Sequence, residues 1–155
     1  MTDRIQNLID AGRLARQEAS DTEVAGLWSN ALEAFADASV PGISPKGRLV
    51  RAYDAGRLAA AALVRSRDLR VRATNHHEVT LAAAGFVAGG GLAALVGELD
   101  ELRTLRIQVE YGWASNVSAE DARNALEIVR RFLDEGAPNL REHRPALESR
   151  IQPPA

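Results

Sequence analysis

The stretch from Leu92 to Gly112 constrains the fold more than any other part of the sequence. It reads LAALVGELDELRTLRIQVEYG and closes at a glycine, the residue that most readily ends a helix in the left-handed conformation. Spacings of three and four residues put six of its side chains on one stripe of a helix: Leu92, Leu95, Leu99, Leu102, Arg106 and Val109. Five of these are aliphatic, so the sequence predicts a long amphipathic helix whose stripe faces other helices.

Arg106 is the one charge on this stripe. A guanidinium keeps its proton, so at a core-facing position it has to be paired with an acid or reached by water. Glu110 stands one turn further along the same helix, and Asp54 is a candidate on a facing helix. We predict that Arg106 is paired with one of these two carboxylates. The alternative is that Arg106, with Arg103 one turn before it, is held for a phosphate.

The composition favours helices over sheets. Hydrophobic residues make up 46% of the 155 residues but aromatic residues only 5%, and alanine and leucine come in long runs. The predicted fold class is therefore all-α, a bundle of about six helices forming a single domain over residues 1–155.

Several classes of protein are excluded by what the sequence lacks. There is no cysteine, which excludes a disulfide framework and a thiolate metal site. The first residues carry no apolar segment of a signal peptide, and no apolar run approaches the length needed to cross a bilayer. We expect a soluble cytoplasmic protein with no membrane contact.

Start and stop signals divide the chain into helices. The predicted helices span residues 3–18, 20–38, 45–67, 75–88, 92–112 and a sixth from 119 onward, with a connector at 68–74 and a short further helix at 140–150. The capping residues that we expect are Ser20 with Glu23, Ser44 before Pro45, Asn75 with Glu78, and Ser118 with Asp121. Three glycines at 89–91 predict a tight turn and not a phosphate loop, because no strand precedes them and no lysine follows.

His76 and His77 open the predicted fourth helix. Adjacent side chains on a helix diverge by about 100°, which is poor geometry for holding one metal ion together. Neither histidine has a second ligand four residues further on. We interpret them as polar residues of the first turn, keep them as candidate binding residues, and predict no metal and no cofactor.

Ordered segments of the chain resemble a known family. These are AYDAGRLAAAAL at 52–63, NHH at 75–77, LRTLRIQVEYG at 102–112 and SAEDA at 118–122. Together they resemble HEPN domains over about residues 45–135, with the N-terminal helices at 3–40 packing on that core. The resemblance implies an α-helical bundle that commonly dimerises. It also implies that active members are metal-independent ribonucleases, which use an arginine followed after four to six residues by a histidine.

The chain departs from that motif at its second position. Arg106 matches the arginine, but Tyr111 stands where the histidine is expected, and neither Gly112 nor Trp113 replaces it. A phenol with a reference pKa of about 10 is protonated at neutral pH, so it is a poor general base compared with imidazole. We therefore predict that the protein lacks ribonuclease activity.

Two functions follow from these residues. In the first, this is a non-catalytic helical-bundle protein that binds a protein or RNA partner, for example a nucleotidyltransferase-type protein in a toxin-antitoxin or stress-response pair. In the alternative, it is a metal-independent ribonuclease with an atypical site made of Arg106 and Tyr111, with His76 or His77 supplying an imidazole. The candidate site residues are Arg103, Arg106, Glu110, Tyr111, His76 and His77.

A homodimer is the oligomeric state that we expect. The helix at 92–112 and the helix that carries Tyr53 are the predicted contributors to its two-fold interface. The reason is that an apolar stripe with one arginine in it suits a seam that meets its own copy.

Overall fold

The computed structural model describes residues 2–72, 74–112 and 116–155 of the chain, so Trp113 lies outside the described residues. Six helices make up most of it, which confirms the predicted all-α bundle. In chain order the elements are α1 (Thr2–Asp10), β1 (Leu14–Arg16), α2 (Asp21–Ala38), α3 (Pro45–Ser66), β2 (Leu69–Val71), α4 (His76–Ala88), α5 (Gly90–Glu110), α6 (Ala119–His143) and a 3-10 turn (Pro145–Leu147). Within these ranges, no helix is long and apolar enough to span a membrane.

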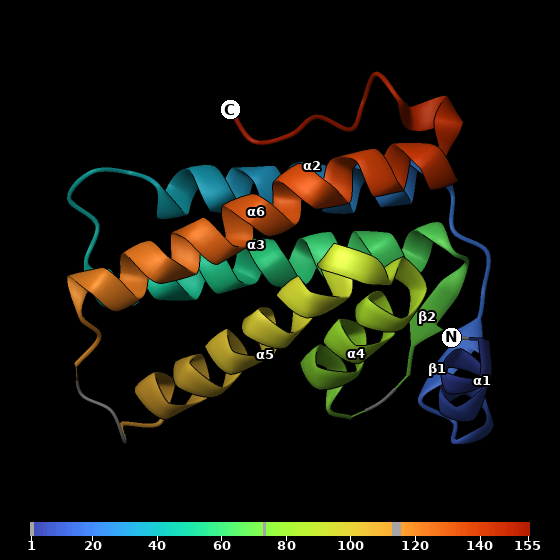
Figure 1. The fold of residues 1–155 in the computed structure, drawn as a ribbon, viewed down its shortest axis with the longest axis horizontal. Coiled ribbons are helices and arrows are strands. Elements are labelled where there is room, and N and C mark those ends of the chain that lie inside the picture. Colours follow the sequence, from blue (N-terminus) through green and yellow to red (C-terminus); the bar gives the residue numbers. More distant parts are fainter. Residues whose placement is uncertain (1, 73, 113–115) are drawn as a thin grey trace.

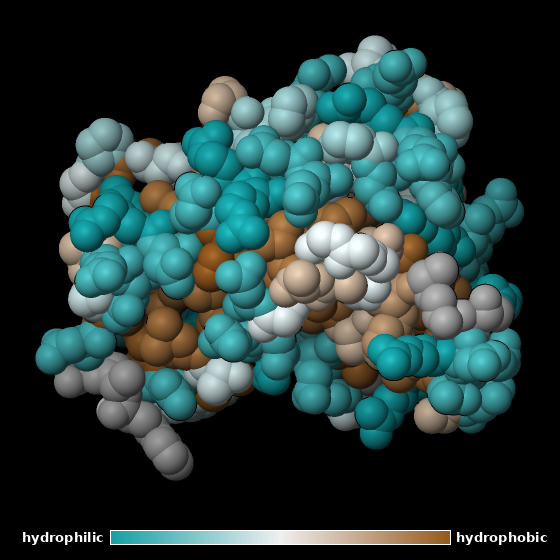
Figure 2. All heavy atoms as spheres, viewed as in Figure 1, coloured by the Kyte–Doolittle hydropathy of each residue, from teal (hydrophilic) through white to brown (hydrophobic). Residues whose placement is uncertain are grey.

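Helix α3 is the centre of the bundle. It contacts α2, α4, α5 and α6, and Figure 1 shows it running between α2 and α6 on one side and α4 and α5 on the other. Its buried residues include an alanine-rich stretch at 59–62, whose short side chains let neighbouring helices approach closely. The hydropathy of the surface differs between the two sides, since Figure 2 shows hydrophobic residues gathered over α4 and α5 and mostly hydrophilic ones over α2 and α6.

Helices α3 and α5 meet at a glycine. A Cβ atom added to Gly56 would lie 2.7 Å from Cδ2 of Leu99, which is too close for the present packing. Gly56 is therefore needed for the short distance between these helices, and that distance positions the second half of α5 against α3.

The apolar stripe of α5 is buried as predicted, but within its own chain. All five of its aliphatic side chains are buried, and α5 packs on α3, α4 and α6. Tyr53 on α3 is likewise fully buried. The intramolecular core therefore covers both the stripe and Tyr53. The dimer, and the contribution of these two helices to its interface, stay predictions.

A short antiparallel pair of strands replaces two predicted features. The helix expected at 3–18 ends at Asp10, and Gly12 turns the chain with φ +74° into β1. The expected connector at 68–74 contains β2, and Leu14 pairs with Val71 across the two strands. Leu14, Leu69 and Val71 are buried, so pairing satisfies the backbone while these side chains enter the core.

Arg65 connects this pair of strands to the bundle. The residue is 7% exposed. Its guanidinium donates to the Glu23 carboxylate at 2.6 and 3.2 Å and to the backbone oxygens of Gln17, Glu18 and Leu69. The side chain of Glu23 is thus directed to Arg65 and does not complete the predicted capping box with Ser20. Only the Ser20 half of that cap is present, with Oγ accepting from the Glu23 amide at 3.1 Å.

The other helix boundaries test the remaining predictions of capping residues and of a glycine turn. Ser44 caps α3, the full capping box of Ser118 and Asp121 begins α6, and Gly89 forms the tight turn between α4 and α5. The Asn75 side chain accepts no hydrogen bond from the backbone amides of the first turn of α4, so that predicted cap is wrong. Its amide instead donates to the Glu78 carboxylate at 3.3 Å.

The end of the chain also differs from the prediction. Helix α6 continues to His143 through Pro138, so there is no separate helix at 140–150 and only the 3-10 turn follows. Packing explains the continuity, because Gly136, Ala137 and Leu140 are buried on one face and Gly136 lies against the Trp28 ring. Proline removes one helical hydrogen bond, and this buried face offsets the loss.

We predict that Gly56→Ala lowers the free energy of unfolding by about 1–3 kcal/mol, because the new methyl group forces Leu99 to move within a packed core. The matched control is Gly26→Ala on α2, where the added methyl group has open space. That control should raise the free energy of unfolding by about 0.5–1 kcal/mol. Urea unfolding measures both, and stabilisation by both substitutions would show that α3 and α5 are not in close contact.

Candidate functional site

A cavity of about 450 Å³ lies between the start of α4 and the second half of α5, and we call it the α4–α5 cavity. Five of the six predicted site residues are among its lining residues, which are Thr74, Asn75, His76, His77, Glu78, Arg103, Arg106, Ile107 and Tyr111. The sixth, Glu110, contacts Arg106 from the next turn of α5. Segments almost thirty residues apart in the sequence are thus brought together at one site.

Arg106 is paired with both carboxylates that the sequence proposed. Its Nη2 lies 3.3 Å from Oε1 of Glu110 and 3.8 Å from Oδ1 of Asp54, and its side chain is 20% exposed. Both distances are longer than those of strong charge-assisted hydrogen bonds, which are about 2.7–2.9 Å. Among the described residues, its buried Nε has no hydrogen-bond partner. Arg106 is therefore paired, but it keeps donor capacity.

The Tyr53 ring packs against the guanidinium of Arg106. The guanidinium carbon lies 5.3 Å from the centroid of the buried Tyr53 ring, which is cation-π geometry. Burial raises the pKa of the phenol to about 12, so Tyr53 is neutral at physiological pH. Within the described parts of the chain, its hydroxyl has no hydrogen-bond partner. Sequence reasoning did not select Tyr53 as a site residue, although it precedes Asp54 on the same helix.

His77 also lies close to the Tyr53 ring, at 6.1 Å between ring centroids. Burial lowers its pKa below the ordinary value, and the nearby charges of Arg57 and Arg106 lower it further. His77 is therefore a neutral imidazole at pH 7. Because one of its nitrogens then accepts while the other donates, it can hold or take up a proton.

Arg57 was also missed in the sequence. With His76, His77 and other residues it lines a second hollow, of about 320 Å³, between α3 and the start of α4. Its Nε is buried without a hydrogen-bond partner among the described residues. The signal that could have found it is its position four residues after Tyr53, where a charge follows a buried ring by one helical turn.

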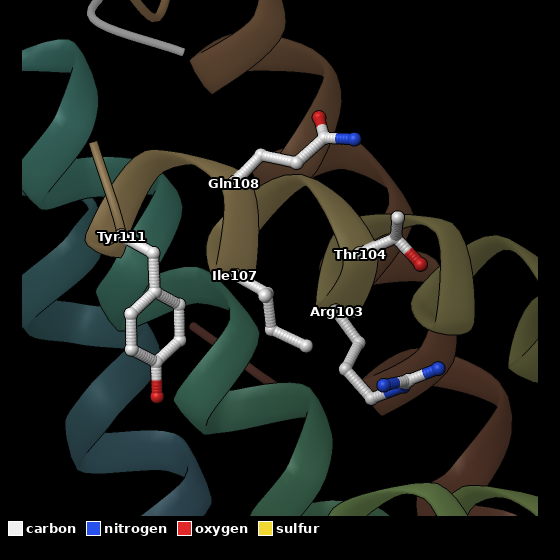
Figure 3. Close-up of a pocket in the computed structure, with 5 residues that line it drawn as sticks. All are labelled: Arg103, Thr104, Ile107, Gln108 and Tyr111. Atoms are coloured by element: carbon white, nitrogen blue, oxygen red, sulfur yellow. The ribbon is translucent and has the colours of Figure 1, made fainter. Parts of the chain in front are cut away.

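Tyr111 stands at the edge of the site. It is the C-terminal cap residue of α5 and is 73% exposed. Figure 3 shows its ring on the same side of α5 as Ile107 and Arg103. Its phenol therefore faces solvent at the mouth of the cavity and is not enclosed with Arg106.

The α4–α5 cavity has the chemistry of an anion site. Arg103, whose Nε donates to Asp100 at 2.9 Å, and Arg106 are the two arginines of its lining. The start of α4 adds amide groups that the Asn75 side chain does not cap. Glu78 is the one carboxylate among the lining residues. In the part of the chain that the structure describes, no group of three histidine, aspartate or glutamate side chains could hold a metal ion.

Comparison with known proteins agrees with this architecture. The family model described as HEPN domain matches residues 48–140, which is more than half of the chain. The protein belongs to the HEPN family. No curated protein and no solved structure matches the chain.

The match covers the helices that build the site. It begins near the start of α3 and ends within α6, close to the core of 45–135 that the resemblance suggested. The matched residues include Arg106 and Tyr111, the two positions at which the resemblance was compared with the family motif. Arg106 lines the cavity, and Tyr111 is exposed.

We predict that Arg106→Leu lowers the free energy of unfolding by about 1–2 kcal/mol, because it leaves the largely buried Asp54 carboxylate with a weaker partner set. Adding Asp54→Asn to that variant should recover most of the loss, and a double-mutant cycle measures the coupling.

The matched control for this measurement is Arg131→Leu, since Arg131 is half exposed and lies 3.9 Å from Glu98. An exposed pair of this kind contributes about 0–1 kcal/mol. If Arg106→Leu unfolds at the same urea concentration as the parent or at a higher one, the ion pairs of Arg106 do not stabilise the fold. The role of Arg106 is then to bind a ligand.

Proposed function

We propose that this HEPN-family protein binds RNA without cleaving it, with a backbone phosphate held in the α4–α5 cavity. The observation that carries this proposal is the combination of Arg103, Arg106 and the uncapped start of α4 around one cavity. A phosphate accepts hydrogen bonds from guanidinium and amide groups alike, and both kinds of donor are present here.

The free donors of Arg106 support phosphate binding. Its Nε has no partner among the described residues, and its two ion pairs are long. A phosphate entering the cavity would supply the acceptor that Nε lacks. The planar guanidinium offers its donors in a fixed fork, which matches the oxygens of a phosphate group.

The absence of cleavage rests on Tyr111. RNA cleavage by the neighbouring 2′-hydroxyl needs a base that takes up a proton near neutral pH. The group at the position of the family histidine is a phenol, and it is exposed at the mouth of the cavity. Its geometry and its chemistry both argue against that role.

We predict that a single-stranded oligoribonucleotide binds the protein and stays intact. Arg106→Gln should weaken binding about 10- to 100-fold, the effect of losing one charged contact, and reduce the slope of log affinity against log salt by about 0.7. Arg131→Gln on α6, outside the cavity, should leave affinity unchanged. Fluorescence anisotropy measures affinity and gel electrophoresis measures cleavage; equal affinities of the Arg106 and Arg131 variants would contradict the proposal.

One observation favours a second function, the metal-independent ribonuclease. His77 lines the same cavity as Arg106, and its lowered pKa keeps it neutral at pH 7. In that reaction His77 would accept the 2′-hydroxyl proton while the 2′-oxygen attacks phosphorus, with Arg106 stabilising the charge. A 2′,3′-cyclic phosphate forms, and the 5′-oxygen leaves as a hydroxyl that takes its proton from water. Cleavage that is abolished by both Arg106→Gln and His77→Asn, but not by Tyr111→Phe, would establish this function in place of the first.

The protein is further proposed to act in the cytoplasm as a homodimer. The support is the family, whose members commonly dimerise and pair with nucleotidyltransferase-type proteins in toxin-antitoxin or stress-response systems. Such a protein is the partner that we propose beside RNA.

Light scattering tests the dimer directly. We expect a molecular mass of twice 16.7 kDa at micromolar concentrations of the chain. A mass near 16.7 kDa at these concentrations and above would refute the dimer, whatever the outcome of the RNA experiments.

A further inference from the structure

Another hollow, of about 580 Å³ and separate from the one that Arg57 lines, lies along the outer face of α5 beside the α4–α5 cavity. Its described lining residues are Arg103, Thr104, Ile107, Gln108 and Tyr111. Arg103, Ile107 and Tyr111 line the α4–α5 cavity as well, so the two spaces share a wall. We call the hollow on the outer face of α5 the outer hollow.

The outer hollow presents an exposed apolar surface next to positive charge. Tyr111 is 73% and Ile107 42% exposed, and they are two of the three large hydrophobic side chains exposed in the described residues. Spacing of four residues places Arg103, Ile107 and Tyr111 on one stripe, and Figure 3 shows these side chains on the same side of α5. Thr104 and Gln108 lie further round the helix and add polar groups.

The Tyr111 ring at the end of α5 lies largely in solvent. The two adjacent spaces share Arg103, Ile107 and Tyr111, so a positive charge and an exposed ring lie close together. A ligand that carries an anion and, close to it, a planar ring fits this combination.

A nucleotide unit of a single strand has this composition. Arg106 and Tyr111 both line the α4–α5 cavity, and their positions on α5 are separated by a rise of about 7.5 Å, so one strand can contact both. Aromatic side chains stack on bases of single strands because every base has a π face, whereas the bases of a duplex are already stacked. Gln108 offers both a donor and an acceptor beside the ring.

We propose that Tyr111 is a base-stacking residue: the RNA strand places a phosphate in the α4–α5 cavity and an unpaired base on the Tyr111 ring, against Ile107. This inference rests on the RNA binding proposed above and names its substrate class, which is single-stranded RNA. It also gives the tyrosine at the position of the family histidine a role in binding.

The experiment compares Tyr111→Ala with Tyr111→Phe in anisotropy titrations of a single-stranded oligoribonucleotide. Tyr111→Ala should weaken binding about 5- to 150-fold, the effect of losing one stacked base, while Tyr111→Phe keeps the affinity within about threefold. Because Tyr111 is exposed, neither variant should alter the thermal melt. On a duplex of the same sequence, Tyr111→Ala should have no effect.

The phosphate site is tested separately with inorganic pyrophosphate, using the NMR resonance of the His77 ring as the reporter. Pyrophosphate should shift that resonance equally in the parent and in Tyr111→Ala, and the shift should be lost in Arg106→Gln. A shift in the parent combined with equal RNA affinities of parent and Tyr111→Ala would overturn the stacking inference alone. No shift and no RNA binding would overturn the proposed function and the inference with it.

Three further outcomes decide between occupants of the outer hollow. If Tyr111→Phe loses as much affinity as Tyr111→Ala, the hydroxyl and not the ring is recognised, and stacking is refuted. If AMP competes as tightly as the oligonucleotide, the ligand is a free nucleotide and not a strand. If Tyr111→Ala converts a dimer to a monomer in light scattering, the ring is a contact between copies and the proposal fails.

Discussion

The close approach of α3 and α5 at Gly56 is the constraint on which the candidate site depends. Because Gly56 has no Cβ, the Leu99 side chain packs directly against α3. Two turns further along α5, this contact places Arg106 over the Tyr53 ring and within 3.8 Å of Asp54. A larger residue at position 56 would force the Leu99 side chain to move and so disturb this contact. The geometry of the cavity is thus set by packing at a residue that does not line it.

Much of this arrangement could be predicted from the sequence because it depends on local signals. The stripe of α5 has a helical period, so its burial and the position of Arg106 within it follow from spacing alone. Ser44 and Ser118 cap their helices through atoms only three residues away. Asp54 and Glu110 were proposed as partners of Arg106, and both are in contact with it.

The features that could not be predicted depend on contacts between distant segments. Strands of three residues are too short for alternation to identify them, and β1 is recognisable only once β2 lies beside it. Glu23 has the spacing of a capping box, but the buried Arg65 is a stronger partner for its carboxylate than a backbone amide. Tyr53 and Arg57 become site residues because α4 packs over α3, a contact without a sequence signature. For the same reason, periodicity shows that the α5 stripe is buried but not that helices of the same chain cover it.

The loose pairing of Arg106 reconciles its structural role with its proposed binding role. A phosphate that draws the guanidinium toward the cavity would weaken both ion pairs, and a buried acid left alone would oppose that movement. Glu110 is 42% exposed, so water can solvate it when its partner turns away. Asp54 is largely buried, but Arg51 donates to it at 3.3 Å and remains as a second partner. Both carboxylates therefore keep a partner, water or Arg51, when Arg106 moves. Arg106 can stabilise the α3–α5 contact in the free protein and still be available to an anion.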